Sequence, residues 1–217
     1  MKQWKKKFIE FMIKKKILKF GNFTLKCNRK SPYFFNMALF HTGKDLYTLG
    51  TFYAQALVNL NIKFDLLFGI AYKGIPIVIS TVIALKKIYN INIKYSFNRK
   101  EIKKYGEKGN TVGSKLHGNI VIIDDILTAG TAIKNTLKFL LNKKKKISNI
   151  LVALDRKEFG NKNSFAKNDI EKKYSCKISS IINIDDITNY LKSKKIMKEK
   201  LKILLKYREK YILNKIN

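Results

Sequence analysis

The spacing of hydrophobic residues predicts helices at the N-terminus and across residues 42–60. Trp4, Phe8, Phe11 and Met12 recur at helical spacing with lysines between them, as in an amphipathic helix. We expect this stripe to pack against the rest of the domain, and a role at a membrane surface is the alternative. Residues 23–26 and 33–36 flank a turn-rich stretch, which predicts a hairpin.

Short apolar runs farther along the chain have the composition of buried parallel strands. Helical patterns separate them, including one that ends near Ile88, one at residues 132–141 and a terminal one at 197–213. This alternation predicts an α/β fold with a mainly parallel sheet and helices on both faces. We expect one domain over residues 1–217, with residues 1–40 as a cap. The predicted strands cover residues 64–70, 93–97, 120–123, 150–154 and 178–182.

The segment from residue 120 to residue 132 carries the strongest functional signal. An apolar strand runs into Asp124 and Asp125, and a loop of small and hydroxyl residues at 128–131 precedes a helix. The N-terminus of a helix suits a phosphate, and paired carboxylates suit ribose hydroxyls or hydrated Mg²⁺. The alternative is that the carboxylates only cap the helix while Gly130 makes a turn.

Polar segments follow three other predicted strands, at residues 71–76, 98–115 and 155–156. Ligands of open parallel sheets bind beyond the carboxyl ends of strands, so these segments predict one composite site. Lys73 is a candidate pyrophosphate contact or a plain surface lysine. The basic segment 98–115 is a candidate lid over a polyanion, or a solvated loop.

Composition narrows the other possibilities. The net charge of +31 comes mostly from lysine, and with abundant Ile and Asn it fits a compositional bias better than nucleic-acid binding. The two cysteines lie far apart, and only two histidines occur, so neither a disulfide framework nor a zinc site is expected. No apolar run approaches ~20 residues, and the N-terminus does not resemble a secretory signal. We therefore expect a cytoplasmic protein.

The segment 120–132 resembles the phosphoribosyl pyrophosphate signature of type I phosphoribosyltransferases. Nearly the whole chain is similar to one branch of that family, the bacterial orotate phosphoribosyltransferases. The Ser-Pro-Tyr-Phe-Phe-Asn stretch at 31–36 and the Phe-Asn-Arg-Lys stretch at 97–100 are typical of the orotate branch. Tyr105 departs from the family, which usually has His there. Further similar stretches are residues 20–26, 29–30, 64–76 and 155–156.

The resemblance implies transfer of ribose 5-phosphate from phosphoribosyl pyrophosphate to orotate, giving orotidine 5′-phosphate in pyrimidine biosynthesis. It implies catalytic roles for Lys103, Asp124 and Asp125. It also implies Mg²⁺ held mainly through the pyrophosphate, with Asp125 as a water-mediated ligand. Orotate would contact Phe34, Phe35, Thr128 and Arg156. Phosphoribosyl pyrophosphate would contact Lys26, Tyr72, Lys73, Arg99, Lys100, Lys103, Tyr105, Asp124, Asp125, Ile126, Leu127, Thr128, Ala129, Gly130, Thr131 and Ala132.

The same resemblance implies a homodimer whose lid at residues 98–115 completes the neighbouring site. Two other functions are possible. A nucleic-acid-binding regulator on the same fold has only the positive charge in its favour and would need a helix-turn-helix segment. A purine phosphoribosyltransferase shares the acidic motif, but the aromatic run at 33–35 speaks against it.

Overall fold

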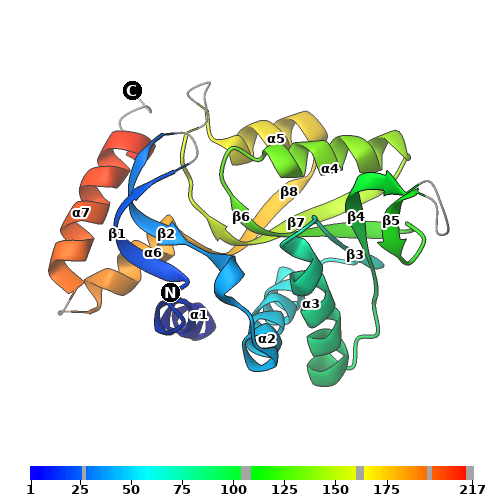
Figure 1. Cartoon of the computed structure of the whole chain (residues 1–217), viewed down its shortest axis with the longest axis horizontal. Helices are drawn as coiled ribbons and strands as arrows, with labels where there is room; N and C mark the ends of the chain where they lie inside the picture. The colour runs from blue at the N-terminus through cyan, green and yellow to red at the C-terminus, as the bar shows by residue number, and fades with distance from the viewer. Residues whose placement is uncertain (26–27, 104–108, 160–163, 195–196, 214–217) are drawn as a thin grey trace.

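The fold is a central six-stranded sheet covered by helices, with a small two-stranded sheet beside it (Figure 1). The computed structural model describes all residues except 26–27, 104–108, 160–163, 195–196 and 214–217. The strand order is β5-β4-β3-β6-β7-β8, and only β5 runs antiparallel to its neighbour. The strands are β3 (Leu66–Gly69), β4 (Lys94–Lys103), β5 (Gly109–Gly113), β6 (Asn119–Leu127), β7 (Lys146–Asp155) and β8 (Lys177–Asn183).

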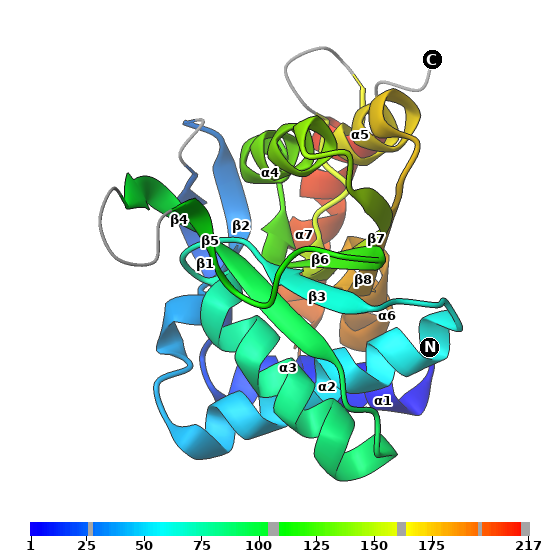
Figure 2. The same ribbon diagram turned by 90° about the vertical axis from the view of Figure 1, so that its right-hand side faces the viewer.

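Both faces of the sheet are buried, as the apolar runs predicted. In β6, Val121 and Ile123 join one hydrophobic cluster, while Ile120 and Ile122 join a second. Figure 2 shows the two layers, with α4 and α5 on one side of the sheet and α2 and α3 on the other. The α/β fold is therefore confirmed. The first layer holds α1 (Gln3–Lys14), α2 (Gly43–Leu60), α3 (Gly74–Tyr89), α6 (Ile184–Lys192) and α7 (Lys198–Arg208), and the second holds α4 (Thr131–Asn142) and α5 (Ala166–Tyr174).

The N-terminal region packs onto the first layer. Strands β1 (Leu18–Thr24) and β2 (Lys30–Phe35) form the predicted hairpin. The α1 side chains of Phe8 and Met12 are fully buried in the same cluster as the sheet, so packing, rather than a membrane surface, accounts for the apolar stripe. Among the described residues, no helix is apolar enough over a sufficient length to cross a membrane.

The structure differs from the predicted elements at several places. The segment 98–115 is not one long loop, because β4 continues to Lys103 and pairs with β5. Strand β6 continues four residues beyond Ile123, so the paired carboxylates lie inside it. Helices α5 and α6 were not predicted, and the terminal helix ends in a π-helical turn, η3 (Glu209–Leu213).

Close contact between α2 and α3 gives a prediction for stability. A Cβ atom at Gly50 would lie 2.3 Å from the carbonyl oxygen of Ser80 in α3. Because backbone cannot rotate away, Gly50→Ala should lower the free energy of unfolding by roughly 1–3 kcal/mol, the usual cost of overpacking. Urea titration at constant pH measures the change.

Gly43→Ala is the matched control, because it lies in the same helix and its Cβ would have no atom within 4 Å. Removing a glycine there should leave the stability unchanged or raise it slightly. Equal destabilisation by both substitutions would show that loss of glycine, and not the contact with α3, causes the effect.

Candidate active site

Four neighbouring strands direct their following segments to one edge of the sheet. Strands β4, β3, β6 and β7 are adjacent and parallel, so their carboxyl ends lie together. Gly69 at the end of β3 is in register with Phe97 and Ile123, and Leu127 is in register with Asp155. The structure thus brings together the polar segments that the sequence suggested as a composite site.

Asp124 and Asp125 lie side by side in β6 and are only 8% and 6% exposed. Burial raises the pKa of Asp124 to about 8, and the neighbouring Asp125 carboxylate contributes to the rise. The Lys73 ammonium, from the turn that follows β3, pairs with the Asp125 carboxylate at 2.8 Å. Beneath the pair, the hydroxyl of Tyr53 in α2 donates to the backbone carbonyl of Asp124 at 2.8 Å.

The loop after β6 is open to solvent. Thr128, Ala129, Thr131 and Ala132 are exposed, while Ile126 and Leu127 still belong to the strand. Gly130 has a φ of 72°, and a Cβ there would lie 2.5 Å from Ile170 in α5. Glycine therefore permits both the left-handed turn and the close approach to α5. The turn leads directly into α4, whose first residue is Thr131.

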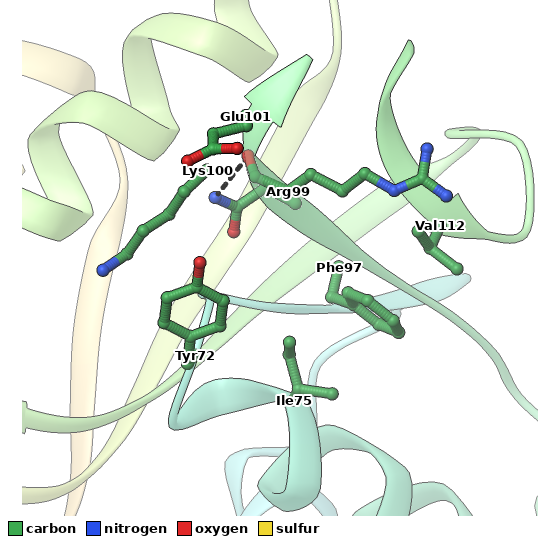
Figure 3. A pocket seen from close by; sticks show the side chains of 8 residues that line it. Tyr72, Ile75, Phe97, Arg99, Lys100, Glu101 and Val112 are labelled. Atoms are coloured by element: carbon green, nitrogen blue, oxygen red, sulfur yellow. Dashed lines mark hydrogen bonds between the residues drawn. The ribbon is translucent and has the colours of Figure 1, made fainter. Parts of the chain in front are cut away.

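The turn after β3 borders a cavity of about 420 Å³ between β4 and the start of α3 (Figure 3). The Ala71 amide donates to the Asn98 side chain at 2.8 Å, which ties this turn to β4. The Lys100 ammonium lies 4.4 Å from the centre of the Tyr72 ring. Arg99 extends to the opposite side of β4 from Lys100, so these two cations do not converge within one chain (Figure 3).

Arg156 follows β7 and is buried, at 2% exposure, against the hairpin. Its Nε donates to Glu158 at 2.7 Å, and its Nη2 donates to the Ser31 hydroxyl at 2.9 Å. The guanidinium also lies 4.1 Å from the centre of the Tyr33 ring. Arg156 therefore joins the end of the sheet to β2.

The two aromatic candidates of β2 have different environments. Phe35 is 5% exposed and belongs to the hydrophobic core. Phe34 is half-buried and stacks on Phe23 at 5.4 Å between ring centres. Only Phe34 thus offers an accessible ring in this structure. Lys26 and Tyr105 lie outside the described residues, and of Lys103 only the backbone, at the end of β4, is described.

Several polar residues around Arg156 were not singled out from the sequence. Ser31 and Tyr33 stand in the stretch that suggested the family, and Glu158 follows Arg156 by two residues. Tyr207, which donates to Glu158 at 2.6 Å, lies 49 residues farther along the chain. No local pattern could have indicated that contact, because it depends on how α7 packs.

Comparison with known proteins identifies the family. The family model "Phosphoribosyl transferase domain" matches residues 40–189. The orotate phosphoribosyltransferase of Buchnera aphidicola is 54% identical over 95% of this chain and 99% of its own length. That of Erwinia tasmaniensis is 49% identical, with 97% and 99% covered.

The solved structure of the orotate phosphoribosyltransferase of Francisella tularensis is also similar. It superposes with a TM-score of 0.84 at 38% identity, over 95% of this chain and 99% of that one. This likeness extends the match beyond the family model to the N-terminal helix, the hairpin and the C-terminal helix. The chain belongs to the phosphoribosyltransferase family, in its orotate phosphoribosyltransferase branch.

Proposed function

We propose that the chain transfers ribose 5-phosphate from phosphoribosyl pyrophosphate to orotate, giving orotidine 5′-phosphate and pyrophosphate in pyrimidine biosynthesis. One observation carries the proposal: an acidic and hydroxyl floor at residues 124–132 lies at the same sheet edge as the buried cation Arg156. The floor suits a phosphorylated sugar, and the guanidinium suits a carboxylate. Relatives with this name share about half of their residues with the chain, over nearly its full length.

Each group of the sugar donor would have its own place along the floor at residues 124–132. The exposed loop 128–132 and the N-terminus of α4 would hold the 5-phosphate, because unpaired amides and the helix dipole favour an anion there. Asp124 and Asp125 would accept hydrogen bonds from the ribose hydroxyls. Lys73 stands next to them, where the pyrophosphate would lie.

Lys73 has to exchange partners during binding. Its side chain is 54% exposed, although its ammonium pairs with Asp125. A pyrophosphate carries more negative charge than one carboxylate, so it would draw the ammonium away. Asp125 would then be free to face the sugar. In the described part of the chain, no third His, Cys, Asp or Glu gathers beside the carboxylates of Asp124 and Asp125. The site therefore fits a Mg²⁺ that keeps water and substrate oxygens as its main ligands.

The reaction depends on stabilising the charges that develop on the sugar and on the departing pyrophosphate, and it needs no nucleophilic side chain. The bond from ribose C1 to the pyrophosphate oxygen breaks and that oxygen keeps the electron pair, while a ring nitrogen of orotate bonds to C1 through an oxocarbenium-like transition state. The nitrogen gives up its proton to solvent or to the departing pyrophosphate. Lys73, Lys100 and Lys103 would hold the departing pyrophosphate, and Mg²⁺, when bound, would add positive charge to it. The carboxylate of Asp125 would lie against the positive sugar, with Asp124 beside it.

Orotate would occupy the side of the site nearest β2. Its carboxylate would pair with Arg156, its ring would lie on Phe34, and Thr128 would contribute a hydroxyl. Phe35 would act through the core, by holding β2 in place, since it is buried there. Lys26 and Tyr105 remain predictions from the resemblance.

A homodimer also belongs to the proposal. Helix α3 exposes Ile83 and Ile88 at 55% and 42%, and Tyr72, just before the helix begins, is 63% exposed. A second copy that covered these side chains would remove apolar surface from water. Arg99 extends to the side of β4 away from its own Tyr72 (Figure 3), and in this chain it donates to the Gly109 carbonyl at 3.5 Å. The lid role of residues 98–115, the cap role of residues 1–40 and a cytoplasmic location remain predictions.

A substrate assay tests the proposal directly. With phosphoribosyl pyrophosphate and Mg²⁺, the chain should consume orotate and release pyrophosphate. The kcat/KM for adenine, hypoxanthine or guanine should be lower by about 10²-fold or more, because those bases lack a carboxylate for a buried arginine. Equal use of a purine base, or no turnover of any base, would contradict the proposal.

Asp124 gives a prediction that couples stability to function. Between the ordinary aspartate pKa of about 4 and its raised value of about 8, the folded chain binds one proton more than the unfolded chain. This group therefore makes stability fall as the pH rises through that window. Asp124→Asn removes the effect, so its stability relative to the natural chain should increase by on the order of 2 kcal/mol between about pH 5 and pH 8.

The same variant should lose turnover by about 10²-fold, the usual scale for one preorganised electrostatic group. Denaturant titrations at both pH values and initial rates measure the two effects. A variant that is less stable than the natural chain at the higher pH would contradict the assignment of a buried, repelling carboxyl.

A mixed-dimer experiment tests the shared site. Lys103→Ala and Asp125→Asn chains should each be nearly inactive, one through the lid and the other through the floor. After co-refolding, about half of the dimers are mixed, and each holds one site with both defects and one with neither. Activity should therefore recover to roughly a quarter of the natural value. Mass spectrometry confirms the mixed dimers, and their inactivity would mean that each lid serves its own chain.

A further inference from the structure

Glu158 connects three distant parts of the chain at the orotate end of the proposed site. Its Oε1 accepts from Arg156 Nε at 2.7 Å and from the Tyr207 hydroxyl at 2.6 Å. Its Oε2 accepts from Arg29 at 3.1 Å. The carboxylate side chain is only 8% exposed. The end of β7, the start of β2 and the C-terminal helix therefore meet at one carboxylate.

Tyr207 can act only as a donor to this carboxylate at neutral pH. Burial and the neighbouring Glu158 raise the pKa of Tyr207 to about 12, so its hydroxyl keeps its proton. Its ring is 6% exposed and meets the Tyr33 ring edge-on, at 6.2 Å between centres. Hydrogen bonds to a charged acceptor are short and strong, and they hold geometry well. Tyr207 therefore fixes the position of Glu158 from α7.

The arginine is held on its face and on two of its three nitrogens. Tyr33 lies against the guanidinium plane, Glu158 contacts both Nε and Nη2, and Ser31 binds Nη2. Nη1 takes no part in these three contacts. Because a guanidinium is rigid and planar, holding it in this way sets the direction in which its remaining donors point.

We propose that Glu158 and Tyr207 are positioning residues for orotate, through which the C-terminal helix sets the orientation of Arg156. This inference rests on the proposed function, in which Arg156 binds the orotate carboxylate. The two side chains would not touch the substrate. They would determine how well Arg156 is prepared for it, since orientation before binding lowers the entropic cost of binding.

A simpler role for Glu158 predicts the opposite result. If Glu158 only balanced the arginine charge, it would repel the orotate carboxylate. Removing its charge would then strengthen orotate binding and lower the KM. A positioning role predicts a higher orotate KM, because Arg156 loses its fixed direction. The sign of the change in the orotate KM therefore separates the two roles.

The test compares Tyr207→Phe, Glu158→Gln and Arg156→Lys with the control Tyr190→Phe. Tyr190 is also buried, at 5% exposure, but it lies in α6 and is not among the residues that contact Arg156 in the described structure. Tyr190→Phe therefore matches the loss of a buried hydroxyl. Steady-state rates give kcat and the KM of each substrate, and thermal unfolding gives the stability of each variant.

We expect Tyr207→Phe to raise the orotate KM about 3- to 10-fold and Glu158→Gln about 10-fold or more, on the scale of one charge-assisted hydrogen bond. The KM of phosphoribosyl pyrophosphate should stay within about 2-fold for both, because the floor at residues 124–132 is untouched. Tyr190→Phe should leave both KM values unchanged, whatever its effect on melting. If Glu158→Gln does not fold, Tyr207→Phe decides the question.

The outcomes separate the inference from the proposed function. No turnover of orotate by the natural chain refutes the proposed function. An unchanged orotate KM in Arg156→Lys refutes the role of Arg156, and the inference with it. A raised KM in Arg156→Lys, with an unchanged or lowered KM in Tyr207→Phe and Glu158→Gln, overturns the inference alone. Equal rises for both substrates would also overturn it, because they would indicate a general structural effect.

Discussion

The structure depends on placing two adjacent carboxylates in a buried central strand. Desolvation and mutual repulsion oppose the ionised pair, as the raised pKa of Asp124 shows. Lys73 offsets part of the cost by pairing with Asp125. The rest must come from the apolar surface that β6 buries on both faces of the sheet. A strand that the core buries on both faces therefore carries these unfavourable charges, and ligands with hydroxyl groups or positive charge would relieve them.

The scarcity of acidic residues in this basic chain also affects how its elements pack together. The chain has 15 acidic residues against 46 basic ones, so cations outnumber carboxylates about threefold. In the described structure, buried or half-buried acids join separate segments: Asp186 with Lys5, Asp45 with Lys15, and Glu158 with Arg29. The excess lysines can vary on the surface, while each of these acids joins segments that are separate in the sequence. Loss of an acid should therefore matter more than loss of an average lysine.

The sequence predicted the parts of the fold that have a strong local pattern. The central strands and α2 and α3 stand out because their hydrophobic residues are spaced regularly. Strands β4 and β5 were missed beyond Phe97, since an edge hairpin rich in Lys, Asn and Gly buries too little to show a pattern. The start of α6 did have a signal, because Asn183 and Asp186 form a capping box that could have been read. The contact of Tyr207 with Glu158 had none, because it arises only when α7 folds back on β2.

The two ends of the proposed site are built in different ways, and this bears on how one fold acquires its substrate preference. The sugar end uses strand ends and one loop of the central sheet, which the matched domain at residues 40–189 contains. The base end uses Ser31, Tyr33 and Phe34 of the hairpin and, through Glu158, Tyr207 of the last helix, so most of it lies outside that domain. A common fold can keep one chemistry while added segments select the acceptor. In this chain the hairpin side and α7 meet at Glu158, beside Arg156, so in the proposed site acceptor choice would depend on the packing of the two ends of the chain against each other.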